Sequence, residues 1–291
     1  MGHNIHIRKI LITAKSEYLK WICNERMVLL LVAFVFINNI IITPLLEHSK
    51  VMESPINILE PYIAVLNSNT MIITVPVIFL ALFSDFPMMK GNTLFILIRT
   101  SKLDWLLGQL LFVFYAVASY IGILFGFSVL TVLNEGFWAN GWSLVVTKYA
   151  ELYPDQAYSM GCLLIKWNLH HQVSPWYAAA AGTVMMFLYL MLVPLIMLFF
   201  YTFFHNKVTG LLTVGIITAL GSVFYIADME AMWFFPIAHI AIQAHFTKYF
   251  AAGNIPAVFS FVYFVLLFLM LFIGSVFGIK RADFESIPEI D

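Results

Sequence analysis

A single polar stretch interrupts an otherwise very apolar sequence. Residues 90–111 read KGNTLFILIRTSKLDWLLGQLL, and their charged side chains are Lys90, Arg99, Lys102 and Asp104. Apolar residues at positions 94, 95, 97, 98 and 103 would give a short helix here one apolar side and one polar side. Such a helix at a membrane edge can dock on a partner protein and transmit its motion, because a helix moves as a rigid unit. The simpler alternative is a membrane anchor, for which the basic residues suffice.

Two histidine pairs are the other candidates for chemistry. His170 and His171 are adjacent, and His239 and His245 lie six residues apart. Neither pair has carboxylates or cysteines at a usual ligand spacing, except that Cys162 lies eight residues before His170. We therefore expect hydrogen-bonded histidines and no metal site.

Signatures of hydrolysis and of nucleotide binding are missing. Tyr201-x-x-x-His205 lies near the end of an apolar run, but no paired glutamates within a run could activate water. The sequence has no His-Glu-x-x-His, and none of its 15 glycines is followed by lysine, which excludes a Walker phosphate loop. We expect a non-catalytic chain that binds no cofactor of its own.

The composition is that of a membrane protein. Of the 291 residues, 62% are hydrophobic and 11% are charged, whereas an ordinary globular domain has about 45–50% and about 25%. The net charge of -1 leaves no basic excess to hold nucleic acid.

Six uncharged runs are long enough to cross a bilayer, which needs about 20 apolar residues. Backbone polar groups at that depth must be satisfied within the chain, so we expect helices. The fold class is therefore an all-α polytopic membrane protein with one domain over residues 1–291. The expected spans are approximately 27–46, 62–84, 105–133, 177–204, 208–227 and 256–279.

The basic residues predict the orientation of these spans. With a cytoplasmic N-terminus, eleven of the fifteen lysines and arginines fall on the inner side and four on the outer side. This bias predicts that both termini are cytoplasmic. Cys23 and Cys162 then lie on opposite sides of the membrane, and we expect no disulfide.

Three segments outside the spans have their own character. In residues 5–26, Ile7, Leu11 and Ala14 lie on one helical face and Thr13 lies opposite, which predicts a helix on the inner membrane surface or, alternatively, a soluble helix that covers a partner. Residues 134–176 are rich in tryptophan and tyrosine and predict an interfacial cap, with a substrate-handling lid as the alternative. Residues 228–256 hold apolar pieces too short to span and predict short helices.

Two glycine pairs permit close helix packing. Gly122 and Gly126, like Gly274 and Gly278, are four residues apart within apolar runs. We expect packing within the chain, and a seam between two copies is the alternative.

The stretch at 90–111 resembles the segment between the second and third spans of type-2 ABC permeases. There, a charged residue and Gly-Thr-Leu precede a leucine run, a small polar break, an aromatic residue and Leu-Gly-Lys. Asn92 is inserted in this sequence and Gln109 replaces the lysine. The corresponding positions are Lys90, Gly91, Thr93-Leu94, Ile96 to Ile98, Thr100-Ser101, Trp105 and Leu107-Gly108. The amphipathic N-terminal helix, the six spans and the short helices before the last span agree with the same family.

The resemblance implies one half of an exporter in a bacterial cell membrane. A second permease, either a copy or a paralogue, and two separate ATPase subunits would complete it, with ATP and magnesium held by the ATPases. The segment near Arg99–Asp104 would be the cytoplasmic coupling helix. The residues expected to meet the ATPase are Lys90, Gly91, Thr93, Arg99, Thr100, Lys102 and Asp104.

Aromatic-rich, uncharged spans suit an amphipathic or hydrophobic substrate, such as a peptide, a drug or a lipid-like molecule, because burying a charge there costs several kcal/mol. Two other functions stay open. One is an immunity or sensor protein that binds a peptide through residues 134–176. The other is an ion-coupled transporter, against which the charge-free spans count.

Overall fold

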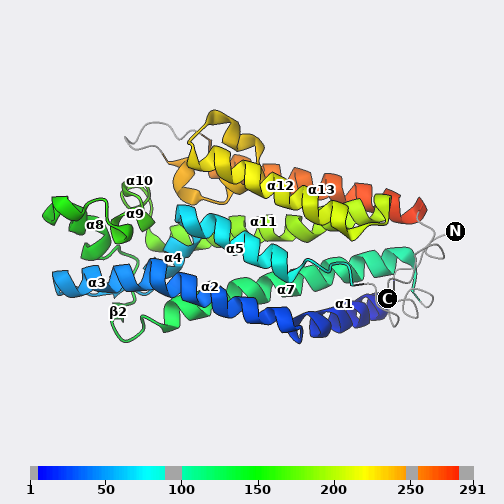
Figure 1. Ribbon diagram of the computed structural model, residues 1–291, viewed down its shortest axis with the longest axis horizontal. Coiled ribbons are helices and arrows are strands. Elements are labelled where there is room, and N and C mark those ends of the chain that lie inside the picture. The colour runs from blue at the N-terminus through cyan, green and yellow to red at the C-terminus, as the bar shows by residue number, and fades with distance from the viewer. Residues whose placement is uncertain (1–5, 89–99, 247–254, 282–291) are drawn as a thin grey trace.

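The computed structural model describes residues 6–88, 100–246 and 255–281, which form a long bundle of helices (Figure 1). Five helices in these ranges are long and apolar enough to cross a membrane, and five of the predicted spans each overlap one of them. The predicted helical class of a membrane protein is confirmed at this level. The five helices are Glu25–Met52, Lys102–Leu130 (α7), Pro175–Phe204 (α11), Lys207–Ile226 (α12) and Ala257–Arg281 (α13).

The first of these helices changes its winding along its length. It consists of a 3-10 turn at Glu25–Val28 (η1), then α2 (Leu29–Ile37), a π-helical turn at Asn38–Ile42 (η2) and α3 (Thr43–Met52). Pro44 lies in the first turn of α3. Because proline has no N–H to donate and crowds the preceding turn, the wider π turn before it lets the helix continue.

The second predicted span, 62–84, is wrong as one continuous helix. It is divided into α4 (Glu60–Asn67) and α5 (Asn69–Leu82), which are bent by 77° at Ser68. Ser68 has an extended backbone and caps α5 by accepting a hydrogen bond from the N–H of Met71 at 3.2 Å. The described chain therefore has six crossings only if this bent pair crosses once.

A segment far along the chain satisfies the break between α4 and α5. The backbone oxygen of Asn67 accepts a hydrogen bond from Gln243 Nε2 at 2.5 Å, and Asn67 Oδ1 accepts one from the Gln243 N–H at 3.1 Å. The expected short helices between the last two spans are found here as 3-10 turns. They are η4 (Glu230–Phe234), η5 (Pro236–His239) and η6 (Ile242–His245), packed against α11, α12 and α13.

A cap of short elements covers one end of the bundle, which we call the α8 end (Figure 1). Glu60, fully buried in the first turn of α4, ties the cap to the bundle. Its carboxylate accepts hydrogen bonds from the Ser143 N–H at 2.7 Å, the Ser143 hydroxyl at 2.8 Å and the Asn57 N–H at 3.0 Å. The cap comprises the parallel strands β1 (Ile56–Asn57) and β2 (Gly136–Phe137), then α8 (Leu144–Leu152), η3 (Pro154–Gln156), α9 (Met160–Leu164) and α10 (Trp167–His170).

The start of α1 (Ile7–Ile22) and the end of α13 lie together at the other end of the bundle, which we call the α1 end (Figure 1). The predicted N-terminal helix is present, and a residue of its predicted polar face is buried. Thr13 is buried against α7, while Ile7 and Leu11 are 70% and 47% exposed. The reason is Gly108 of α7, whose missing side chain lets Thr13 pack directly on the α7 backbone.

The two glycine pairs differ in their surroundings. Gly274 and Gly278 of α13 lie against Phe199 and Thr202 of α11, with no space for a Cβ atom. This is the close approach that the sequence predicts. Around Gly122 and Gly126 of α7, no atom of another described element comes within 4 Å of the place that a Cβ atom would occupy, so the packing expected there within the chain is absent among the described residues.

Replacing Glu60 tests its role in holding the cap. Glu60→Ala leaves three buried donor groups without their acceptor, and each such loss costs about 1–3 kcal/mol. We expect a loss of about 3 kcal/mol or more in unfolding free energy, measured by thermal unfolding in detergent. The control is Glu47→Ala, at an exposed position of α3. Equal unfolding midpoints for the two variants would contradict this role.

Candidate functional site

The described residues on either side of residues 89–99 lie in the half of the bundle nearer the α1 end. Residues 86–88 follow α5, and Thr100 and Ser101 precede α7. Of the residues predicted to meet a partner, Lys90, Gly91, Thr93 and Arg99 lie outside the described residues. Thr100, Lys102 and Asp104 lie at the start of α7.

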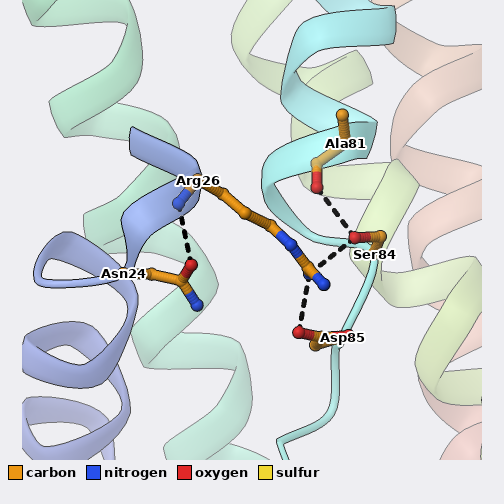
Figure 2. A network of polar contacts seen from close by, with 5 residues as sticks. All are labelled: Asn24, Arg26, Ala81, Ser84 and Asp85. Carbon is orange, nitrogen blue, oxygen red and sulfur yellow. Dashed lines mark hydrogen bonds and ion pairs between the residues drawn. The ribbon is translucent and has the colours of Figure 1, made fainter. Parts of the chain in front are cut away.

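An arginine joins the α1–α2 link to the end of α5 (Figure 2). Arg26 Nη1 lies 2.7 Å from Asp85 Oδ2 and donates a hydrogen bond to Ser84 Oγ at 2.7 Å. Ser84 in turn donates to the Ala81 carbonyl at 2.8 Å. Asn24 fixes the other end of the arginine, because its side-chain oxygen accepts from the Arg26 N–H at 2.9 Å.

This ion pair contributes little stability, so its main effect is to orient the α1–α2 link relative to the end of α5. The side chains of Arg26 and Asp85 are 38% and 54% exposed, and pairs this exposed contribute about 0.2–1 kcal/mol. The apolar contacts beside this ion pair contribute more to the packing of α1 on α5 and α7. Buried Trp21 packs against Phe83 and Phe112, with ring centroids 5.7 and 6.4 Å apart.

Helix α1 runs alongside the first half of α7. Asp104 Oδ1 accepts a hydrogen bond from the His6 N–H at 3.2 Å, and further along, the hydroxyls of Tyr18 and Ser119 are hydrogen-bonded at 2.7 Å. The contacts advance in the same direction on both helices, so the two run in parallel. Ser101 caps α7 by accepting from the Asp104 N–H at 3.1 Å.

The α1–α7 seam contains buried polar atoms that have no hydrogen-bond partner among the described residues. Both atoms of the Gln109 amide group are in this state, as are Thr13 Oγ1 and Glu17 Oε2. The other carboxylate oxygen of Glu17 accepts from Lys20 at 2.8 Å, yet burial dominates and raises the pKa of Glu17 above its ordinary value. The cluster also includes Asp104 Oδ2 and Trp21 Nε1.

Each unsatisfied buried polar group costs about 1–3 kcal/mol relative to a hydrated one. The two helices are therefore closely packed, but several buried polar atoms between them do not have, within the described ranges, the hydrogen bonds that they could form. Separation of α1 from α7 would let water reach Thr13, Glu17 and Gln109 and would recover part of that cost. In contrast with the carboxylate of Glu60, these groups favour an interface that can open.

A second feature, an apolar cavity of about 580 Å³, lies on the membrane helices nearer the α8 end. Small residues of α7 and α11, among them Gly122, Ala118 and Ala180, line it together with large apolar and aromatic side chains. Its hydroxyl groups are satisfied internally, because Tyr62 and Thr183 are hydrogen-bonded at 2.8 Å and Thr183 donates to the Ala179 carbonyl at 2.7 Å. The cavity thus offers an apolar surface without a charged group.

The sequence located the polar segment but not the interactions around it. The Arg26–Asp85 pair joins residues 59 positions apart, and no local pattern predicts it. Gln109 gave one signal, since an amide within an apolar helix needs a partner. Glu60 and Asp104 show that buried acids do occur in the first turns of the apolar helices.

Comparisons of this chain with protein-family models, with curated proteins and with solved structures find no match.

Replacing the unsatisfied amide tests the seam. Gln109→Met keeps the side-chain volume and removes both unsatisfied polar atoms, so we expect the protein to gain about 1–2 kcal/mol of unfolding free energy. Thermal unfolding in detergent measures this gain. Thr183→Val is the matched control, since it removes a satisfied hydroxyl and should destabilise. A destabilised Gln109→Met variant would show that the amide has a partner after all.

Proposed function

We propose that this chain is the membrane subunit of an ATP-driven exporter of amphipathic or hydrophobic molecules. The observation that carries the proposal concerns α5 and α7, the helices on either side of residues 89–99 in the chain. The Arg26–Asp85 pair joins the end of α5 to the start of α2, and the hydrogen bond from the His6 N–H to Asp104 joins α1 to the start of α7. A force applied to residues 89–99 reaches α5 through residues 86–88 and α7 through Ser101. The Arg26–Asp85 pair passes part of it to α2.

The poorly satisfied seam supports the same function. A transporter that alternates between two states needs an interface that opens at little cost. The seam between α1 and α7 meets this requirement, because its buried polar groups gain hydration on opening. Its position beside Asp104 places it next to the segment expected to dock a partner.

The apolar cavity supports the substrate class. Its volume of about 580 Å³ falls within the 300–1,000 Å³ that is typical of small-molecule sites. Trp138 and Trp176 stand at one end of it with ring centroids 6.1 Å apart, as expected for side chains at the headgroup level. A molecule with an apolar body and a polar end suits this arrangement.

The energy would come from two partner ATPases, which hold ATP and magnesium, and a second permease copy or paralogue would complete the path. The resemblance of residues 90–111 to type-2 ABC permeases is the basis for these partners and for a cytoplasmic α1 end in a bacterial cell membrane. The polar face with Arg99 and Lys102 would meet the ATPase.

A second candidate function is a sensor or immunity protein that binds a peptide at the cap. A cavity of about 480 Å³ between α8, α9 and α10 favours it. Apolar Val145 and Leu163 line this cavity together with charged Glu151 and Lys166. Such a mixed lining suits a peptide better than a lipid. A protein of this kind would bind saturably without ATP-dependent accumulation of the ligand.

The test of the first function is the complex purified in mild detergent from its native host. We expect an ATPase subunit to copurify, and we expect Arg99→Glu with Lys102→Glu to lower substrate-stimulated ATP hydrolysis at least about tenfold, because opposite charges would repel the docking surface. Lys50→Glu, at an exposed position of α3, is the control. The proposal fails if no ATPase copurifies, or if the double variant hydrolyses ATP like the control.

A further inference from the structure

Three buried polar side chains meet where the 3-10 segment touches α13. His239 of η5 and Ser260 of α13 are 0% exposed, and His245 of η6 is 3% exposed. Ser260 Oγ lies 2.6 Å from His239 Nδ1 and 3.4 Å from His245 Nε2. A serine hydroxyl carries one hydrogen, so it cannot donate to both rings.

The hydrogen positions on His239 follow from its partners. Its Nε2 lies 2.9 Å from the Trp233 carbonyl oxygen, which can only accept, so Nε2 carries the hydrogen. In the neutral ring, Nδ1 is then an acceptor. The one hydrogen of Ser260 therefore goes to His239 Nδ1 across the 2.6 Å contact.

His245 is left one hydrogen short. Its Nδ1 lies 2.7 Å from the Ile255 carbonyl oxygen and donates to it. Its Nε2 is then an acceptor that faces Ser260 Oγ at 3.4 Å, and the hydrogen of that hydroxyl is already used. Two lone pairs thus face each other inside the protein. The His245 ring also lies within hydrogen-bonding reach of the His239 backbone, which favours the charged form.

We propose that His239, Ser260 and His245 form a binding site for a single proton. Taken up on His245 Nε2, the proton would be donated to Ser260 Oγ, while Ser260 continues to donate to His239. Every nitrogen of both rings would then be hydrogen-bonded. A second proton is excluded, because His239 Nδ1 would lose its donor and two positive rings would share one serine.

The surroundings of the site are aromatic and uncharged. The ring of Tyr263 stacks on His239 at 4.2 Å, and Trp233 lies 5.1 Å from His245. A cation within about 6 Å of such a ring is attracted to its face. The acids of this segment, Asp228 and Glu230, are exposed, and no described ion pair joins an acid to either histidine.

Burial opposes proton uptake and sets the pH at which it occurs. Desolvation lowers the pKa of His239 from 6.5 to about 4 and also lowers the pKa of His245. The unfolded chain, with ordinary histidines, binds more protons than the folded chain between these values. Stability should therefore fall as the pH drops below about 6.5.

Uptake of the proton would act on the contact between α13 and the 3-10 segment. Gln243 lies between the two histidines and satisfies the break at Asn67. The same short segment therefore joins α13 to the bend between α4 and α5. The charge at this site would therefore change the stability of the contact between α13 and the 3-10 segment.

Nitrogen NMR of ¹⁵N-histidine protein in detergent tests the site. His239→Gln and His245→Gln assign the two rings among the eight histidines. Near neutral pH we expect His239 with hydrogen on Nε2 and His245 with hydrogen on Nδ1. As the pH is lowered, His245 should be the first of the two rings to become charged, with His239 still neutral. Two rings that stay neutral, two that charge together at the ordinary pKa, or the opposite tautomers would overturn the proposal.

Ser260 variants test the bridge. Ser260→Ala should lower the midpoint for His245 by about one pH unit, because the charged ring loses its acceptor, whereas Ser260→Thr should restore it. Ser275→Ala is the matched control, since Ser275 is equally buried in α13 and bonds its own helix at Leu271. An unchanged midpoint in Ser260→Ala would overturn the proposal, and if that variant does not fold, the tautomers of the unaltered protein still decide it.

Discussion

Backbone polar groups in apolar surroundings must find partners within the chain, and the broken helix at Ser68 shows how this protein meets that constraint. The bend exposes the Asn67 carbonyl, which water cannot reach in a packed bundle. Gln243 supplies both the side-chain donor and the backbone donor that the break requires. The 3-10 segment is therefore obligatory for the shape of α4 and α5, and its own fastening to α13 becomes a structural requirement. Residues 176 positions apart in sequence depend on each other for this reason.

The buried polar groups at the two ends of the bundle differ in whether they are hydrogen-bonded. At the α8 end, the carboxylate of Glu60 is surrounded by three donors, and the cap is held in one arrangement. At the α1 end, side-chain polar atoms of Thr13 and Gln109 are buried without hydrogen-bond partners in the described part of the chain. An interface with satisfied groups resists opening, whereas one with unsatisfied groups gains hydration when it separates. Because of this contrast, we infer that α1 is the element whose separation from the bundle costs the least free energy.

The long helices could be predicted from the sequence because length and apolarity alone decide them. The break at Ser68 could not be predicted in this way, although three polar residues at 67–69 inside an apolar run were a visible sign. The burial of Thr13 in α1 could not be predicted either, for a second reason. Amphipathicity predicts which side avoids water, but in a membrane protein the apolar side can face lipid while a small polar residue such as Thr13 packs on a neighbour. The partners of Arg26 and of His245 required the tertiary structure.

Helix α7 links the seam to the apolar cavity. Gly108 gives it close contact with α1, and Gly122, fourteen residues later and about 21 Å along the axis, opens the cavity wall. An α-helix without an internal break transmits a tilt over such a distance, because its hydrogen-bonded turns resist bending. A change at the α1 seam would therefore alter the width of the cavity between α7 and α11. Two glycines of one helix thus have opposite surroundings, because Gly108 forms a tight contact and Gly122 lies at an open one. The proposed transporter would use this difference when α7 moves.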